Sequence, residues 1–291
     1  MSSDVTNRID SGAFIWCLWL LDIVQALHFD LTVNVFTSRE LWTTMPSSSL
    51  AFQDVYRALL DDKTPQNNLS GEVTSHEDAL LLLMALLSDL LYLRQSLGQV
   101  VRLAASTHTE PPGYNPFTPF TPRNELDHIE TLLSLALDNW HARFHVSVTP
   151  ELMAFYHYTR MYLSFDQLLS LPHIVGYRGL RSGSLSSNEL SISDKTVREA
   201  WLVLDHVAAR AQSPLEGSLC PVWLPVVVFH AGLVVWAKHN LGRVQGGEEY
   251  GSARILLVFK MELAAMPWPC CEEMAATLQR LIPTSTTRQT R

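Results

Sequence analysis

The chain has 291 residues, 47% of them hydrophobic, and its 21 Lys plus Arg against 29 Asp plus Glu give a formal net charge of −8. This length and apolar content are enough to bury a sizeable core, as one large domain or two intimate ones, which excludes a disordered tail. The basic residues are scattered along the sequence, so this segment is not expected to contact a nucleic-acid backbone directly.

The cysteine pattern and the apolar runs argue against a zinc finger, a disulfide framework and a membrane-spanning helix. The chain has four cysteines without the paired spacing of a zinc finger or a disulfide framework: Cys17, Cys220, Cys270 and Cys271. We therefore expect free thiols in a reducing compartment. The apolar stretches 14–24, 79–87 and 222–237 are each shorter than the roughly 18 apolar residues that a spanning helix needs, so we predict core helices there. The N-terminus also lacks the basic-then-apolar pattern of a secretion signal.

The first predicted helix starts with a cap at Asp10 or Ser11 and ends near Phe29. Its apolar residues cover so much of the helix circumference that we expect it to be largely buried: Phe14, Ile15, Leu18, Trp19 and Leu21. A second helix is predicted from a capping box formed by Thr74 and Glu77, and it continues to about Ala104.

A proline-rich connector precedes the third predicted helix. The segment 111–122 has prolines at every third position from Pro116 to Pro122, and each lacks an amide donor and pushes its predecessor toward extended geometry. Phe117 and Phe120 are expected to anchor this extended loop to a core. Beyond Pro122 the apolar residues recur at spacings of 3 and 4, as on one face of a helix: Leu126, Ile129, Leu133, Leu137, Trp140 and Phe144.

The C-terminal half continues the helical pattern. Ser193-Asp194 precedes a helix whose apolar stripe is Val197, Trp201, Leu204, Ala208 and Ala211. The Gly- and Ser-rich segment 176–193 is predicted to be a flexible connector. A helix beginning near Ser252 must break at Pro267-Trp268-Pro269. A closing helix over 272–282 and a frayed polar tail over 284–291 complete the chain.

The predicted fold is all-α, an irregular multi-helix bundle or superhelical stack forming a single domain over 1–291. Ser, Thr, Pro and Gly connectors join the helices, and no segment alternates apolar and polar residues over enough length to indicate a sheet. No internal repeat of fixed period is present, which disfavours solenoid families with a sequence code.

Three blocks of motifs follow one another along the chain. In the first, Arg8 leads into Trp19-Leu-Leu-Asp22, followed by Glu40-Leu41-Trp42, Pro46 and Phe52. In the second, the proline-aromatic connector and the Trp140 helix are followed by Tyr156-His157-Tyr158, Tyr162-Leu163-Ser164 and Phe165-Asp166. In the third, Cys220-Pro221-Val222 leads to His230-Ala-Gly-Leu-Val-Val-Trp236-Ala, and Trp268 precedes the closing helix.

Taken together and in this order, the blocks resemble the regulatory, or middle homology, region of fungal-specific transcription factors, of the kind found with Cys2His2 zinc fingers. The resemblance covers about residues 8–282. Two departures are visible. The family's usual Gly-Arg-Pro loop is replaced by a sequence beginning at His28, and Phe52 stands where the family often has tryptophan.

The resemblance implies a nuclear protein that regulates RNA polymerase II transcription. It implies contacts with protein co-regulators, with intramolecular segments or with a small-molecule effector, without a membrane and without direct contact of this segment with nucleic acid. Zinc is expected only in a finger on the N-terminal side. The chain is accordingly expected to be a C-terminal fragment, a truncated gene model or a finger-less paralogue.

Two patterns suggest a chemical site. Asp138, His141 and His145 share a helix face and could ligate one metal, but Ala142 stands where a His-Glu-x-x-His hydrolase has its acid, so a solvated or partly packed histidine pair is favoured. Asp61-Asp62 suggests the magnesium-diphosphate site of all-α isoprenoid enzymes. No third carboxylate follows at helical spacing, which favours a surface turn.

The remaining patterns carry less chemistry. Ser182 and Ser184 lack the strand and spacing of a nucleophile elbow, and 242–247 matches no phosphate or dinucleotide loop. The tryptophans are expected to be core residues rather than the lining of a ligand pocket. We therefore assign no catalytic, cofactor-binding or metal-binding residue. We expect a regulatory, non-enzymatic protein; a finger-less α-helical interaction scaffold is the alternative, and an isoprenoid-type enzyme a more distant one.

Overall fold

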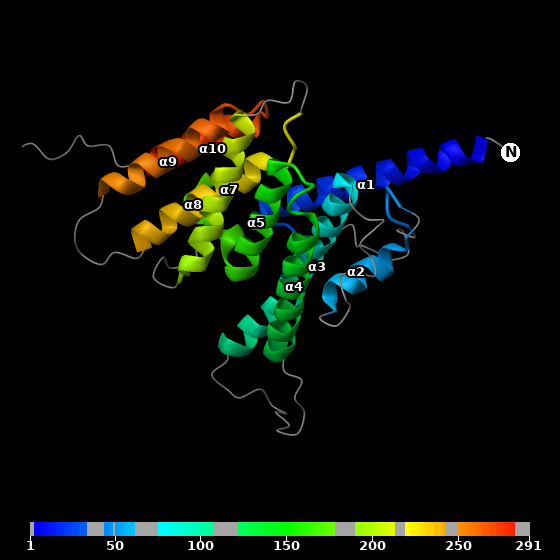
Figure 1. Cartoon of the computed structure of the whole chain (residues 1–291). Helices are drawn as coiled ribbons and strands as arrows, with labels where there is room; N and C mark the ends of the chain where they lie inside the picture. The colour runs from blue at the N-terminus through cyan, green and yellow to red at the C-terminus, as the bar shows by residue number, and fades with distance from the viewer. Residues whose placement is uncertain are drawn as a thin grey trace, which may run out of the picture. The chain divides into compact units, whose positions relative to one another are not determined.

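The computed structural model describes residues 3–33, 44–48, 50–61, 75–106, 122–177, 190–212, 219–241 and 249–282. Within these ranges every regular element is helical, which confirms the predicted all-α fold (Figure 1). The chain divides into two compact units, Met1–Val148 and Thr149–Arg291. The two units are defined by the contacts within each of them. The single regulatory domain over 1–291 stays a prediction.

Four helices make up the described part of the first unit: α1 (Ser3–Phe29), α2 (Phe52–Leu60), α3 (His76–Ser106) and α4 (Pro122–Phe144). α3 packs on α4, α2 packs on α4, and α1 touches α3. α4 ends at Phe144 as predicted, and it begins at Pro122, the last residue of the predicted connector. Its first residue, Pro122, supplies a fixed backbone angle where a missing amide hydrogen costs no helical hydrogen bond.

α3 and α4 are joined by polar contacts as well as by apolar packing. The Trp140 indole, which is fully buried, donates its Nε1–H to the Ala79 carbonyl at 2.9 Å. Arg94 donates from Nε and Nη2 to Glu130 Oε1 at 2.9 and 2.7 Å. Residues 79–87 of α3 are buried on every side, so this stretch belongs to the core of the unit.

α1 differs from its prediction in two respects. It begins at Ser3 and continues without a break to Phe29. Asp10 and Ser11 therefore lie within the helix rather than at its N-terminal cap. It is also two-faced where it was expected to be largely buried: Trp19 and Ile23 are buried, whereas Leu18 and Leu21 remain 44% and 46% exposed. Helical apolar residues are buried only where another element covers them, and sequence alone does not show which face is covered.

The start of α3 lies one residue later than predicted. The helix begins at His76, and the Ser75 hydroxyl caps it by accepting the Asp78 amide at 3.1 Å. The predicted partner Thr74 lies outside the described residues.

Among the described helices, the stretch His76–Ser96 is long and apolar enough to cross a membrane. It is longer than the apolar stretch 79–87 identified from the sequence. In the structure 67% of His76–Ser96 is buried within the protein, as in the core helix of a bundle. A single helix of this kind is weak evidence for a membrane protein.

The second unit contains these described helices: α5 (Pro150–Ser164), η2 (Leu168–Ser170), α6 (Leu171–Ile174), α7 (Asp194–Gln212), α8 (Leu224–Leu241), α9 (Glu249–Ala264) and α10 (Cys270–Leu281). α5 packs extensively on α7, and α9 on α10. The predicted start of α7 is confirmed, since Ser193 Oγ accepts the Thr196 amide at 3.1 Å.

α8 is the core helix of this unit. It contacts α5, α6, α7, α9 and α10, and residues 223–235 are all buried (Figure 1). Gly232 allows the close packing: a β-carbon there would stand 3.2 Å from the Phe259 ring of α9 and 3.3 Å from a Leu278 methyl of α10. The break at 265–269 between α9 and α10 lies where Pro267 and Pro269 predicted it.

Several predictions fall outside the described residues: the motif Glu40-Leu41-Trp42, the connector 111–121, the serines Ser182 and Ser184, the glycine-rich 242–247, and the tail 284–291.

Candidate functional site

A pocket of about 480 Å³ lies in the first unit, where α2, α3 and α4 meet the segment that follows α1. Its volume falls within the range of small-molecule sites, which run from about 300 to 1,000 Å³. Ser88 and Asp89 are polar, and the other lining residues are aliphatic or aromatic: Val33, Tyr56, Leu60, Tyr92, Leu93, Ile129, Leu132 and Leu133.

Burial varies around the pocket. Val33, Tyr56, Ser88 and Leu133 are buried, whereas Tyr92 is 49% exposed. The pocket therefore has a buried base and an aromatic side chain that reaches solvent. A largely apolar recess with a few polar groups is the usual form of a ligand site.

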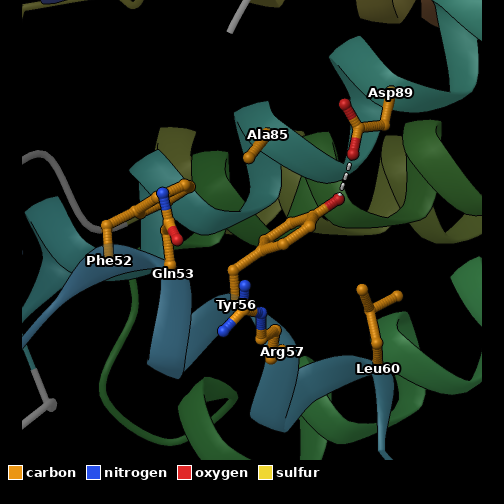
Figure 2. A pocket seen from close by; sticks show the side chains of 7 residues that line it. All are labelled: Phe52, Gln53, Tyr56, Arg57, Leu60, Ala85 and Asp89. Carbon is orange, nitrogen blue, oxygen red and sulfur yellow. Dashed lines mark hydrogen bonds between the residues drawn. The ribbon is translucent and has the colours of Figure 1, made fainter. Parts of the chain in front are cut away.

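A hydrogen bond between α2 and α3 forms one wall. The Tyr56 hydroxyl donates to Asp89 Oδ2 at 2.6 Å, and Figure 2 shows the Tyr56 ring reaching from α2 to Asp89 on α3. Tyr56 and Asp89 also line a smaller hollow of about 60 Å³. Its other lining residues are Phe52, Gln53, Arg57, Leu60 and Ala85. Tyr56 and Asp89 line both hollows, so the bonded pair belongs to the wall of each.

The local sequence explains why these side chains converge. Buried residues on α2 recur at helical spacing, at Phe52, Val55, Tyr56 and Leu59, so one face of this short helix is apolar. The Phe52 and Tyr56 rings stack with centroids 5.6 Å apart, and the Tyr56 hydroxyl points toward Asp89 on α3.

The segment after α1 is held against α3 by a side-chain amide. Gln95 Oε1 accepts the Val33 amide at 3.3 Å, and Gln95 Nε2 donates to the Leu31 carbonyl at 2.7 Å. These two bonds fix Val33 as part of the pocket base. The amphipathic stripe of α4 completes the lining with Ile129 and Leu133.

The histidine pair considered as a metal site is packed on itself. The His141 and His145 rings stack with centroids 4.9 Å apart, and His145 Nδ1 lies 2.9 Å from the His141 carbonyl oxygen. Asp138, on the same helix, is exposed. Among the described residues no three His, Cys, Asp or Glu side chains are grouped to hold a metal ion.

The other predicted positions are spread over the protein. Asp61 is exposed at the C-terminal end of α2, and Asp62 lies outside the described residues. Among the tryptophans, Trp19, Trp140 and Trp223 are buried, and none of those described lines the pocket.

All four cysteines are free thiols, as predicted, with Cys17 exposed, Cys270 half-buried and the other two buried. Burial raises the pKa of the Cys220 thiol. The neighbouring Cys270 side chain and burial together raise the pKa of the Cys271 thiol far above its usual range.

Residues of the second and third motif blocks meet inside the second unit. The hydroxyl of Tyr158 lies 2.9 Å from His230 Nδ1, and the Trp268 indole donates to the Cys220 carbonyl at 3.1 Å. These contacts give the motif residues a packing role.

A carboxylate on α7 holds a second buried polar cluster. His157 Nδ1 lies 2.8 Å from Glu199 Oε2, and Arg160 Nε lies 3.6 Å from Glu199 Oε1. The His206 ring stacks on His157 with centroids 5.1 Å apart. On the same two helices, Arg210 Nε pairs with Glu151 Oε1 at 2.7 Å. Such paired charges keep α5 and α7 in register, because separating them would leave a buried charge uncompensated.

Sequence reasoning missed the polar residues of the pocket. Ser88-Asp89 directly follows the apolar stretch 79–87 and lies inside a helix that continues without a break to Ser106. A serine and a carboxylate on an otherwise apolar helix were the available signal. Tyr56 carried no such signal, because a tyrosine at a core spacing is an ordinary core residue.

Comparison with known proteins identifies no relative: no protein-family profile, no curated protein and no solved structure matches the chain.

Proposed function

We propose that this chain is the regulatory region of a fungal zinc-finger transcription factor, which modulates RNA polymerase II transcription in the nucleus through effector or protein contacts. DNA binding would come from a finger on its N-terminal side, and the chain itself would have no catalytic role. The observation that carries the proposal is the 480 Å³ pocket of the first unit, whose size and mostly apolar lining suit a small-molecule effector.

The geometry suggests how an effector would act. The pocket is lined by side chains from three helices, including Tyr56 on α2, Asp89 on α3 and Ile129 on α4. A ligand in contact with all three favours the arrangement in which they surround it. It thereby shifts the population of helical packings and changes the output of an attached DNA-binding or activation segment.

The order of the three motif blocks is the second support. Motif residues distant in sequence, such as Tyr158 and His230, bond to each other within one core. A regulatory region defined by its helical packing would carry its signature at such positions.

A reporter assay tests the proposal. The chain is fused to a heterologous DNA-binding module and compared with the module alone at matched expression. We expect the fusion to change reporter output. The variant Leu132→Trp, which adds an indole at the half-buried edge of the pocket, is expected to alter that change. Ala142→Trp, on an exposed position of the same helix, is the matched control. An inert fusion with normal expression contradicts the proposal.

A protein-interaction scaffold is the second candidate, and the exposed apolar residues of α9 favour it. Leu257 and Val258 are each 42% exposed, and Met261 is 62% exposed, so apolar side chains gather along one side of this helix. A scaffold would capture a partner that the triple variant to Ser releases, and it would leave the reporter unchanged. An effect on the reporter without partner capture supports the regulatory function instead.

A further inference from the structure

Three of the four cysteines come together in the second unit. Cys270 and Cys271 are the first two residues of α10, and Cys220 lies shortly before α8, which packs on α10. Trp268 bonds to both segments. Its indole Nε1–H donates to the Cys220 carbonyl at 3.1 Å, and its own carbonyl accepts the Cys271 amide at 3.0 Å. The two segments that carry the thiols are therefore held side by side.

The adjacent residues Cys270 and Cys271 form a dithiol whose members interact directly. Consecutive side chains of a helix do not usually face each other. Here the Cys271 thiol hydrogen-bonds with the Cys270 side chain, and neither sulfur is part of a disulfide. Cys270 is half-buried and Cys271 is only 2% exposed. A reagent that approaches from solvent therefore meets Cys270 first.

These thiols are poorly suited to reactions that begin from a thiolate. Burial raises the pKa of the Cys220 thiol, and the Cys270 side chain together with burial raises the pKa of the Cys271 thiol. Because the thiolate is the nucleophile, a protonated thiol disfavours alkylation and oxidation. Condensation with trivalent arsenic differs, because it consumes protonated thiols and releases their hydrogens in water.

We propose that Cys270 and Cys271 are a binding site for a trivalent arsenical, held by two arsenic–sulfur bonds. An arsine oxide loses its arsenic–oxygen double bond, and the two thiol hydrogens leave with that oxygen as one molecule of water. No oxidation state changes. Sulfur is a soft ligand and suits a soft acceptor such as arsenic(III). After the first bond forms at Cys270, the second is intramolecular and is favoured by a high effective concentration.

The site provides two sulfurs, so the arsenic keeps one substituent of its own. Within the described parts of the chain, no three His, Cys, Asp or Glu side chains are grouped to hold an ion, which argues against a ligand bound by three residues. A monosubstituted arsenical has the two open valences that the dithiol can fill. This inference goes beyond the proposed function and does not depend on the pocket of the first unit.

Phenylarsine oxide, which carries one phenyl group on trivalent arsenic, is the probe. The reduced full chain is treated with it under native conditions, and intact-protein mass spectrometry detects bound phenylarsenic. We expect one adduct per chain that survives excess 2-mercaptoethanol and is removed by the dithiol 2,3-dimercaptopropan-1-ol. A monothiol removes an arsenical held by one sulfur, so loss to 2-mercaptoethanol overturns the proposal. An adduct that forms only after unfolding in urea overturns it as well.

Single variants locate the two sulfurs. Cys270→Ser removes the thiol at the half-buried position, and we expect it to weaken binding of phenylarsine oxide at least about hundredfold, because the chelate is lost. Cys271→Ala should have the same effect. Far-ultraviolet circular dichroism checks that each variant is folded. If the buried position does not tolerate alanine, Cys270→Ser decides the question alone, and unchanged binding in this folded variant overturns the proposal.

Two control variants separate the pair from the other thiols. Cys17→Ser removes an exposed thiol of the first unit and should leave the adduct unchanged. Cys220→Ser removes the third thiol of the group and should leave it unchanged as well. Loss of the adduct in Cys220→Ser, with no loss in Cys270→Ser, would assign the arsenical to Cys220 and Cys271 and overturn the proposal.

Discussion

Replacing Gly232 by alanine tests how closely the helices of the second unit pack. In an exposed helix the change would stabilise by about 0.8–1 kcal/mol, because alanine loses less backbone entropy than glycine. Here the new methyl group would lie 3.2 Å from the Phe259 ring and 3.3 Å from a Leu278 methyl, closer than the usual 3.4–4 Å between carbon atoms. Overpacking of this kind costs roughly 1–3 kcal/mol.

The two effects oppose each other, and the packing term is the larger. We expect Gly232→Ala to lower the free energy of unfolding by about 1 kcal/mol, which corresponds to a melting temperature lower by about 2–4 °C. Gly232→Val adds two further methyl groups and should cost about 3 kcal/mol or more. Urea denaturation followed by circular dichroism at 222 nm measures both variants.

A double-mutant cycle identifies the cause. Phe259→Ala removes the ring, including the Cγ atom that stands 3.2 Å from the new methyl group, so it should relieve the cost of Gly232→Ala by at least about 0.5 kcal/mol. Two results would refute the reasoning. One is an alanine variant more stable than the parent protein, and the other is strict additivity in the cycle.

Three further predictions concern other contacts. Trp140→Phe removes a buried indole hydrogen bond and part of a ring, so it should destabilise the first unit by about 2–3 kcal/mol in urea unfolding; a loss below 0.5 kcal/mol contradicts a buried bond. Mass spectrometry after brief maleimide treatment at pH 8 should find Cys17 labelled well before Cys271, whose raised pKa and burial keep it protonated; equal rates would refute this. A hydrogen bond and the charge of Lys238 lower the pKa of Asp194, so its stabilising effect is present above the unfolded aspartate pKa of about 3.9 and is lost as pH falls through the lower folded pKa. The stabilities of parent protein and Asp194→Asn should therefore differ at pH 6 and converge near pH 2, and a constant difference argues against the ion pair.

Local sequence accounts for most of the helices. The spacing of apolar residues predicted α4 and its end at Phe144, and Ser193 and the prolines near Trp268 located the start of α7 and the break before α10. These features depend on neighbours within one or two turns, which is why a sequence reveals them. The start of α3 was misplaced by one residue because Thr74 and Ser75 both have capping side chains, whereas α1 begins seven residues before Asp10 because the helix extends through that capping candidate.

Tertiary structure decided which faces are buried and where a ligand fits. Leu18 and Trp19 are adjacent apolar residues of α1, yet Leu18 is 44% exposed and Trp19 only 1% exposed, because burial depends on which neighbouring element covers each face. The pocket brings Val33, Tyr56, Asp89 and Leu133 together from four separate segments. No local pattern encodes that meeting. The sequence by itself predicted most of the helices, although not the short α2 that carries Tyr56, and the packing of the helices decided the pocket.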